Sequence, residues 1–164
     1  MYVARVLYPV EVLGPGKRVG IWLCGCPRRC KGCSNPELWE FQERYKTTPE
    51  TVFEIIKSVS LNHTIDGFTI TGGDPLYQPE ELKRLLEMLK GISDDILVYT
   101  GYKLSELQND LLENISVLID GEYIEELNDN SLLKGSSNQE VYILDDKQSD
   151  KYRAYFNAEN NKVQ

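Results

Sequence analysis

The sequence predicts an α/β fold, in the form of a partial, open (βα) barrel. Stretches with strand character alternate with helical stretches along most of the chain, which is typical of a parallel sheet. These units are too few to close a full barrel. The residues able to hold ligands follow the predicted strands, where parallel α/β folds bind their ligands. A length of 164 residues suits one domain, so we expect a single domain over residues 1–164.

The first half of the chain supplies two strands and two helical stretches. Residues 2–12 are rich in β-branched and aromatic side chains and predict a strand, with Pro9 indicating an edge position or a break. A glycine-rich turn leads to a second strand, 18–23, which ends directly before the cysteines. A helix start is expected at 34–41, and an amphipathic helix from Thr48 to Val59.

The second half repeats the pattern. Strands are expected at 65–71, 96–100 and 117–119, and the helices between them at 79–89 and 104–112. The last predicted strand is 141–144. The polar tail, about 146–164, is expected to be either a short surface helix around 152–156 or mobile.

Composition excludes several classes of protein. Hydrophobic residues make up 41% of the chain, and no apolar run approaches the roughly 18 to 20 residues of a membrane helix, so we expect a globular protein outside the membrane. The N-terminal residues lack the features of a signal peptide, which favours a cytoplasmic location. A net charge of −8 argues against general nucleic-acid binding.

All the cysteines lie in one short stretch, from Cys24 to Cys33. In a reducing compartment such thiols are more typical of a metal site than of disulfides. Cys26, Cys30 and Cys33 have the spacing C-x3-C-x2-C, and three thiolates can ligate three irons of a cubane cluster and leave the fourth open. We expect Cys24 to be a free thiol without a ligand role.

A structural zinc site is the alternative for this stretch. Zinc sites usually take two pairs of ligands from two separated loops, whereas here the thiols are close together and the single histidine, His63, is remote in sequence. A cluster with incomplete protein ligation suits the spacing better. A non-catalytic zinc or iron–sulfur interaction module remains the alternative of a different functional class.

Polar and glycine-rich residues follow the later strands. Gly72-Gly73-Asp74-Pro75 comes after strand 65–71, Thr100-Gly101 after the next, and Asp120-Gly121 after the third. Turns and helix caps use the same residue types, so each has a structural alternative. Because parallel strands end at one edge of a sheet, we expect these segments to converge on the cysteine stretch.

The spacing of Cys26, Cys30 and Cys33 resembles the signature of the radical S-adenosylmethionine (SAM) enzymes. Residues 14–18 and 25–39 are similar to those of the activating-enzyme group in that superfamily, and Gly72–Pro75 is similar to its Gly-Gly-Glu motif, with Asp in place of Glu. Asp120-Gly121 and residues 135–139 bring the chain close to activators of anaerobic ribonucleotide reductases. The resemblance covers roughly residues 10 to 144.

This resemblance implies a mechanism and its cofactors. The three cysteines would ligate a [4Fe-4S] cluster, SAM would bind the open iron, and one electron would cleave SAM to a 5′-deoxyadenosyl radical. The radical would take a hydrogen from a glycine Cα of a partner, anaerobic ribonucleoside-triphosphate reductase. Two related alternatives are an activase of another glycyl radical enzyme and a small-molecule enzyme of the carboxy-deazaguanine synthase type.

The resemblance also implies a set of SAM-binding residues. The Gly72–Pro75 segment would offer close backbone approach, carbonyls and a carboxylate to the amino group of SAM. Thr100 and Asp120 would contact SAM or bind a monovalent cation. Ser137, Asn138 and Gln139 match a family motif near the SAM pocket. The residues assigned to the cofactor are Gly72, Gly73, Asp74, Pro75, Thr100, Asp120, Ser137 and Asn138.

Basic residues gather in the N-terminal part of an otherwise acidic protein. This basic cluster comprises Lys17, Arg18, Arg28, Arg29 and Lys31. It is either a solvated face or a charge that favours cluster reduction and attracts an acidic electron donor of the flavodoxin or ferredoxin type. In the second case Arg28, Arg29 and Lys31 would form the docking site for the donor or partner.

Overall fold

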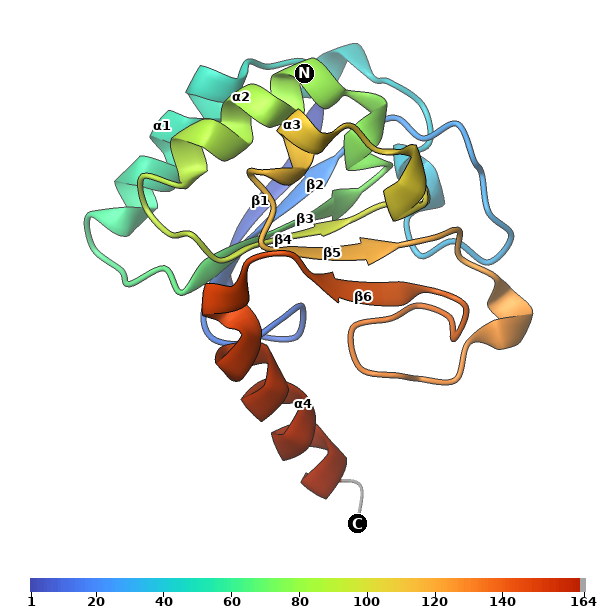
Figure 1. The fold of residues 1–164 in the computed structure, drawn as a ribbon. Helices are drawn as coiled ribbons and strands as arrows, with labels where there is room; N and C mark the ends of the chain where they lie inside the picture. The colour runs from blue at the N-terminus through green and yellow to red at the C-terminus, as the bar shows by residue number, and fades with distance from the viewer. Residues whose placement is uncertain (163–164) are drawn as a thin grey trace.

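A computed structural model describes residues 1–162 and shows one mixed six-stranded sheet (Figure 1). The strands lie side by side in sequence order, from β1 at one end of the sheet to β6 at the other. Their bounds are β1 Val3–Val10, β2 Arg18–Leu23, β3 Gly67–Gly72, β4 Ile96–Tyr99, β5 Val117–Asp120 and β6 Glu140–Ile143.

The pairing of the strands confirms the predicted parallel sheet. β2, β3, β4 and β5 are parallel neighbours, while β1 and β6 run antiparallel to them at the two sides. Leu23 pairs with Gly72, and Tyr99 pairs with Ile119, so the carboxyl ends of the parallel strands form one edge. β1 is an edge strand, as Pro9 indicates, and its register shifts between Leu7 and Val10.

Helices cover the two faces of the sheet unequally. α1 (Pro49–Ser60), α2 (Pro79–Leu89) and α3 (Asn109–Leu112) lie over one face, and α4 (Ser149–Lys162) leaves from the other side (Figure 1). α1 and α2 each begin with Pro at the first turn, where the missing N–H costs nothing. Within residues 1–162, no helix combines the length and apolar character that crossing a membrane requires.

Two hydrophobic clusters correspond to these two faces. The larger cluster joins alternate residues of the strands, such as Ile70 and Val98, to the leucines of α2. The smaller one contains Leu97, Val117 and Ile119 together with Tyr152 of α4. The side chains of a strand alternate between faces, so residues adjacent in sequence, such as Leu97 and Val98, serve different clusters.

The helix predicted over 104–112 is wrong as one element. The chain forms a 3-10 turn, Leu104–Glu106, then two extended residues, and only then α3. The Asp120 carboxylate accepts a hydrogen bond from the backbone N–H of Leu104 at 2.7 Å, which fixes the first turn. The helical spacing of apolar residues over 104–112 therefore covers two short elements instead of one helix. The hydrogen bond from Leu104 to Asp120 of β5 fixes where the first of them begins.

The helix in the tail is longer than predicted. α4 spans Ser149–Lys162, whereas the sequence predicted a short helix around 152–156. Tyr152 is fully buried instead of lying on the surface. The last two residues of the predicted tail, 163–164, lie outside the described residues.

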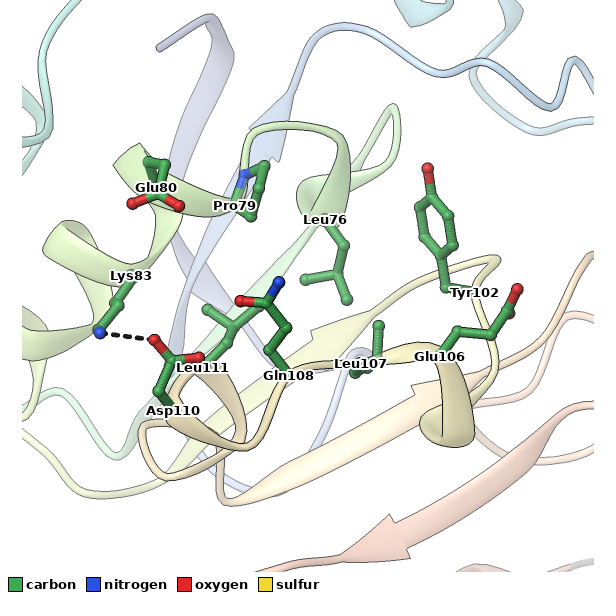
Figure 2. Close-up of a pocket in the computed structure, with 10 residues that line it drawn as sticks. All are labelled: Leu76, Pro79, Glu80, Lys83, Tyr102, Glu106, Leu107, Gln108, Asp110 and Leu111. Atoms are coloured by element: carbon green, nitrogen blue, oxygen red, sulfur yellow. Dashed lines mark hydrogen bonds and ion pairs between the residues drawn. The ribbon is translucent and has the colours of Figure 1, made fainter.

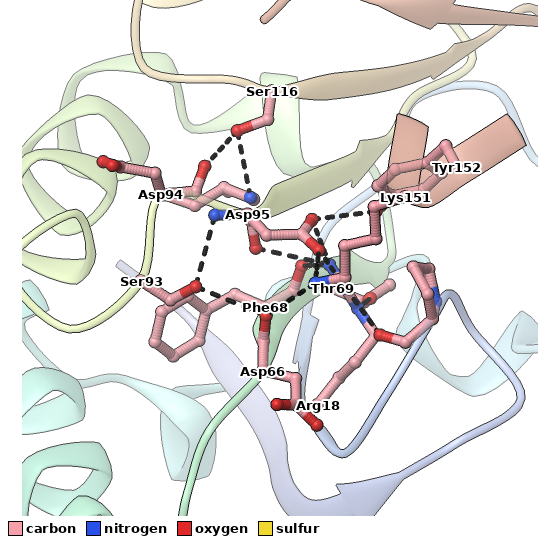
Figure 3. A network of polar contacts seen from close by, with 12 residues as sticks. Arg18, Asp66, Phe68, Thr69, Ser93, Asp94, Asp95, Ser116, Lys151 and Tyr152 are labelled. Atoms are coloured by element: carbon pink, nitrogen blue, oxygen red, sulfur yellow. Dashed lines mark hydrogen bonds and ion pairs between the residues drawn. The ribbon is translucent and has the colours of Figure 1, made fainter. Parts of the chain in front are cut away.

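A buried polar network joins α4 to the sheet (Figure 3). Arg18, at the start of β2, is fully buried and donates to both carboxylate oxygens of Asp95, at 2.9 and 3.1 Å. Its Nε donates to the hydroxyl of Thr69 at 2.8 Å. From α4, Lys151 and Tyr152 also donate to the Asp95 carboxylate, at 2.5 and 2.9 Å.

This network corrects the assignment of Arg18 to the basic cluster. Arg18 lies at the amino end of β2, whereas the cysteines follow its carboxyl end. Its guanidinium is paired and buried, so it offers no charge to a partner at the surface. Burial alone would raise the pKa of Asp95, but the hydrogen bonds and charges of Arg18 and Lys151 hold that pKa below its usual value of 3.8.

Removing the Asp95 charge should strongly destabilise the fold. Asp95→Asn leaves the buried Arg18 without its anion, and we expect the free energy of unfolding at neutral pH to fall by about 3 to 5 kcal/mol. Urea unfolding followed by circular dichroism measures this change. Asp94→Asn, at an exposed neighbouring position, is the matched control and should change little.

The same carboxylate predicts how stability depends on acid. Since the pKa of Asp95 is lowered in the folded protein, its contribution is present above the ordinary pKa and is lost as pH falls through the folded value. We expect the stability difference between wild type and Asp95→Asn to be constant from pH 7 to pH 5 and to shrink below about pH 4. A difference that instead shrinks on raising the pH would contradict this assignment.

Candidate functional site

The carboxyl edge of the parallel strands brings the predicted site segments together. The cysteine loop, residues 24–33, follows β2, and the Gly-Gly loop, residues 72–75, follows β3. Thr100 follows β4, and Asp120 is the last residue of β5. Residues 137–139 lie at the same edge because they precede β6, which is antiparallel.

Backbone hydrogen bonds join the start of the cysteine loop to residues 36–41. The N–H of Gly25 donates to the carbonyl of Leu38 at 2.7 Å, and that of Cys26 donates to the carbonyl of Trp39 at 2.8 Å. The helix predicted at 34–41 is therefore wrong: only a 3-10 turn forms, Pro36–Leu38. The carbonyls that would continue a helix bind the cysteine loop instead.

Close backbone contacts join the cysteine loop to the Gly-Gly loop. The N–H of Gly73 donates to the carbonyl of Leu23, and the N–H of Asp74 donates to the carbonyl of Gly25, both at 2.8 Å. A Cβ on Gly72 would lie 2.4 Å from the carbonyl oxygen of Leu23, and a Cβ on Gly73 would lie 2.4 Å from that of Gly25. Both glycines are required for this approach.

The Asp74 carboxylate is turned into the protein and ties two loops together. It is 2% exposed and accepts hydrogen bonds from the N–H of Leu76 at 3.0 Å, the hydroxyl of Thr100 at 2.8 Å and the N–H of Gly101 at 2.9 Å. Burial raises the pKa of Asp74, against the lowering effect of these donors. Asp74 and Thr100 are separate candidates in the sequence, but their side chains are joined by a hydrogen bond.

Asp120 has a similar role at the end of β5. It is 1% exposed, accepts from the N–H of Leu104, and lies 3.4 Å from the ammonium of Lys103. The structure therefore shows it capping the turn that follows β4. The positive charge beside this carboxylate comes from the protein itself.

Residues 135–139 are locked onto the loop that follows β5. The side chain of Gln139 donates to the carbonyl of Gly121 and accepts from the N–H groups of Gly135 and Ser136. Asn138 donates to the carbonyl of Glu122 at 2.8 Å. Ser137 is exposed, and its backbone N–H donates to the carbonyl of Leu127 at 2.8 Å.

The four thiols occupy two environments. Cys24 is fully buried and its Sγ donates to the carbonyl of Glu40, whereas Cys26, Cys30 and Cys33 are partly exposed. Burial raises the pKa of the Cys26 and Cys30 thiols. For Cys30 the Glu122 carboxylate, 3.7 Å from Sγ, adds to the rise in pKa. The three spaced cysteines are thus partly open to solvent, whereas Cys24 is not.

The basic residues of the loop differ in where they point. Arg29 and Lys31 have side chains 56% and 77% exposed, and they pair with carboxylates of Glu40 and of Glu125 and Glu126. Arg28 is only 23% exposed and packs inward, with its guanidinium over the ring of Tyr102 at 4.5 Å. No sequence pattern indicated a role for Tyr102, because this contact joins loops distant along the chain.

A cavity of about 220 Å³ lies beside this edge, between α2 and the segment that leads to α3 (Figure 2). Leu76 and Tyr102 line it, and Lys83 and Asp110 form an ion pair at its rim. None of the cysteines and neither glycine of the Gly-Gly loop belongs to its lining. The cavity therefore adjoins the predicted site without containing its candidate ligands.

The edge has features that fit an iron–sulfur cluster. Within the described part of the chain, no three His, Cys, Asp or Glu side chains converge as they would on one metal ion. A cubane does not need such convergence, because each cysteine binds a different iron. Three buried side-chain atoms there lack hydrogen-bond partners, and all belong to this edge: Arg28 Nε, Trp39 Nε1 and Asn138 Oδ1.

The contact between the two loops can be tested by adding one methyl group. Gly73→Ala forces a Cβ against the carbonyl of Gly25, and we expect a loss of about 1 to 3 kcal/mol in the free energy of unfolding, with reduced iron uptake. Thermal unfolding and iron content measure the two effects. Gly91→Ala is the control, since its Cβ would meet only the Met88 carbonyl, at 3.2 Å. Equal stability of both variants would contradict the proposed constraint.

Comparison with known proteins places the chain in a family. Residues 12–142 match the family described as a 4Fe-4S single cluster domain. The chain is 37% identical to the anaerobic ribonucleoside-triphosphate reductase-activating protein of Enterobacteria phage T4, over 83% of this chain and 90% of the phage protein. Identity to the protein of that name from Escherichia coli strain K12 is also 37%, over 84% and 96% of the two chains.

A weaker likeness exists to a solved structure. The crystal structure of QueE from Escherichia coli superposes with a TM-score of 0.49, at 18% identity, over 70% of this chain and 68% of that one. The assignment of the family comes from the sequence relatives and from the matched domain. The chain belongs to the 4Fe-4S single cluster domain family and, within it, to the anaerobic ribonucleoside-triphosphate reductase-activating proteins.

Proposed function

We propose that this protein is a radical SAM activase that installs a glycyl radical on anaerobic ribonucleoside-triphosphate reductase. The observation that carries the proposal is the hydrogen-bonded contact between the C-x3-C-x2-C loop and the Gly-Gly loop at one strand edge. The relatives named as activators of that reductase support the choice of partner. We place the reaction in the cytoplasm, with a flavodoxin or ferredoxin-type protein as the electron donor.

We propose that the fold is a partial, open (βα) barrel and a single domain. The sequential strand order and the placement of α1, α2 and α3 on one face support a barrel-like winding. In the described residues the sheet ends at β1 on one side and at β6 on the other. An unclosed side would give a glycine-bearing loop of the partner access to the carboxyl edge.

We assign the cluster to Cys26, Cys30 and Cys33. These three residues would hold the cluster, which would supply the one-electron chemistry needed to cleave SAM for hydrogen abstraction from a glycine Cα. Cys24 has no part in this, because its thiol is buried against the Glu40 carbonyl. The loop after β2 thus has three partly exposed cysteines available as ligands, while Cys24 is buried.

We assign SAM to the edge formed by the ends of β3, β4 and β5. The backbone of Gly72–Pro75 lies closest to the cysteine loop, and Asp74 and Thr100 keep it in shape through their mutual hydrogen bond. Asn138 offers a free buried acceptor, Oδ1, beside the exposed Ser137. Asp120 already has Lys103 as its cation, so we propose no separate monovalent cation there.

The cysteine assignment predicts a clear pattern of activity. Cys26→Ala, Cys30→Ala and Cys33→Ala should each reduce 5′-deoxyadenosine formation to background, because each removes one iron ligand. The measurement uses anaerobically reconstituted protein, a chemical reductant and SAM. Cys24→Ala is the matched control and should retain the activity, with a loss of about 1 kcal/mol in stability from the hydrogen bond. Full activity in any of the three ligand variants would sink the assignment.

The partner is tested separately. When wild-type protein and the reductase are expressed together without oxygen, we expect a glycyl radical signal by electron paramagnetic resonance, and none with Cys30→Ala. A wild-type protein that forms 5′-deoxyadenosine but gives no such signal would indicate a small-molecule substrate instead. Absence of 5′-deoxyadenosine in the wild type would overturn the proposed chemistry itself.

A further inference from the structure

We propose that Arg28 acts inward, as a positioning residue that places a fixed positive charge and an unpaired N–H beside the iron–sulfur cluster. This inference rests on the proposed function, since it concerns the cluster that the cysteine loop would hold. It replaces the expectation that Arg28 shares a donor-docking surface with Arg29 and Lys31.

The orientation of Arg28 separates it from its neighbours. Its side chain is 23% exposed, against 56% for Arg29 and 77% for Lys31. The exposed pair already have carboxylate partners at the surface, which weakens any attraction they exert on an acidic protein. Arg28 is therefore the residue of this loop whose charge is directed into the site.

Two neighbouring loops hold the Arg28 side chain in place. Its guanidinium lies over the ring of Tyr102, 4.5 Å from the centroid, a favourable cation–π geometry. A Cβ on Gly101 would lie 2.3 Å from Arg28 Cδ, so only glycine leaves room for the side chain there. The cysteine loop is thereby fixed over the end of β4 as well as over β3.

Asp74 does not use up the hydrogen-bonding capacity of Arg28. The Asp74 carboxylate accepts from Leu76, Thr100 and Gly101, and Arg28 Nε remains 3.9 Å from Oδ2, beyond hydrogen-bond distance. Arg28 Nε is buried and has no partner in the protein. A buried donor of this kind is costly unless something accepts from it.

The acceptor that the location offers is a cluster sulfur. Arg28 stands between Cys26 and Cys30 in the sequence, so cluster ligands flank it on both sides. Asp74, whose carboxylate lies 3.9 Å from Arg28 Nε, also donates its backbone N–H to the carbonyl of Gly25, directly before Cys26. Hydrogen bonds and positive charge close to cluster sulfurs stabilise the reduced state and raise the reduction potential.

The burial of the charge decides how strongly it acts. The Arg28 side chain is 23% exposed and that of Arg29 is 56% exposed, so solvent screens the charge of Arg28 less and Arg28 should influence the cluster more than Arg29 does. The two residues are adjacent and equally charged, and both lie between Cys26 and Cys30 in the sequence. Arg28 and Arg29 therefore form a matched pair, and they differ mainly in the direction and the solvent exposure of their side chains.

The test compares Arg28→Gln with Arg29→Gln in reconstituted protein, by a redox titration followed by electron paramagnetic resonance, without SAM or a protein donor. At a fixed potential near the wild-type midpoint, Arg28→Gln should lower the ratio of reduced to oxidised cluster on the order of tenfold. Arg29→Gln should leave it unchanged. Arg28→Lys, which keeps the charge, should recover most of the ratio.

Other results would overturn the proposal. Equal ratios in wild type and Arg28→Gln, or equal shifts in Arg28→Gln and Arg29→Gln, would show that Arg28 has no special action on the cluster. If Arg28→Gln fails to bind iron, the proposal is tested with Tyr102→Leu, which removes the aromatic ring under Arg28. Tyr102→Phe, which keeps the ring, is the control. Tyr102→Leu should lower the ratio of reduced to oxidised cluster, and Tyr102→Phe should not. Equal ratios in these two variants would also overturn the proposal.

The proposed function fails on a different result. It is lost if wild-type protein binds no cluster or forms no 5′-deoxyadenosine, whatever the Arg28 variants show. The redox titration needs a cluster but neither SAM nor the reductase. A cluster that forms without an Arg28 effect therefore rejects this inference and leaves the activase proposal standing.

Discussion

The backbone contact between the ends of β2 and β3 is the constraint on which the site depends. The two hydrogen bonds from Gly73 and Asp74 to Leu23 and Gly25 bring the loops so close that a Cβ on Gly72 or Gly73 would meet a carbonyl oxygen. This contact fixes the start of the cysteine loop against rigid strands. The rest of the edge follows, because Asp74 then reaches Thr100 and Gly101 at the end of β4.

The opposite end of the sheet is held by a different kind of interaction. There Arg18 and Asp95 form a buried, hydrogen-bonded ion pair that α4 completes through Lys151 and Tyr152. Such a pair contributes little net stability compared with apolar packing, but losing one partner is expensive. The amino ends of the strands are therefore held in place by a buried ion pair, whereas the carboxyl ends are held by backbone hydrogen bonds between loops.

The charges around the cysteine loop are mostly arranged in pairs. Arg29 and Lys31 face carboxylates, Asp120 faces Lys103, and Cys30 lies beside Glu122. Among these paired groups, the buried Nε of Arg28, which has no hydrogen-bond partner, is more distinctive than the total charge of the cysteine loop. The composition of the loop is basic, yet Arg29 and Lys31 are paired with surface carboxylates, whereas the carboxylate nearest to Arg28 is the buried Asp74.

The alternation of strands and helices, the cysteine spacing and the glycines of the Gly-Gly loop could be predicted from the sequence, because these depend on local periodicity and on short-range backbone geometry. Three features could be recognised only in the folded chain: the burial of Arg18, the return of residues 36–41 to bind the cysteine loop, and the hydrogen bond of Asp74 with Thr100. Each of these depends on a partner far along the chain. Residue type and spacing indicate which groups can interact, but which partner a side chain finds is set by the packing of strands and loops at the two ends of the sheet.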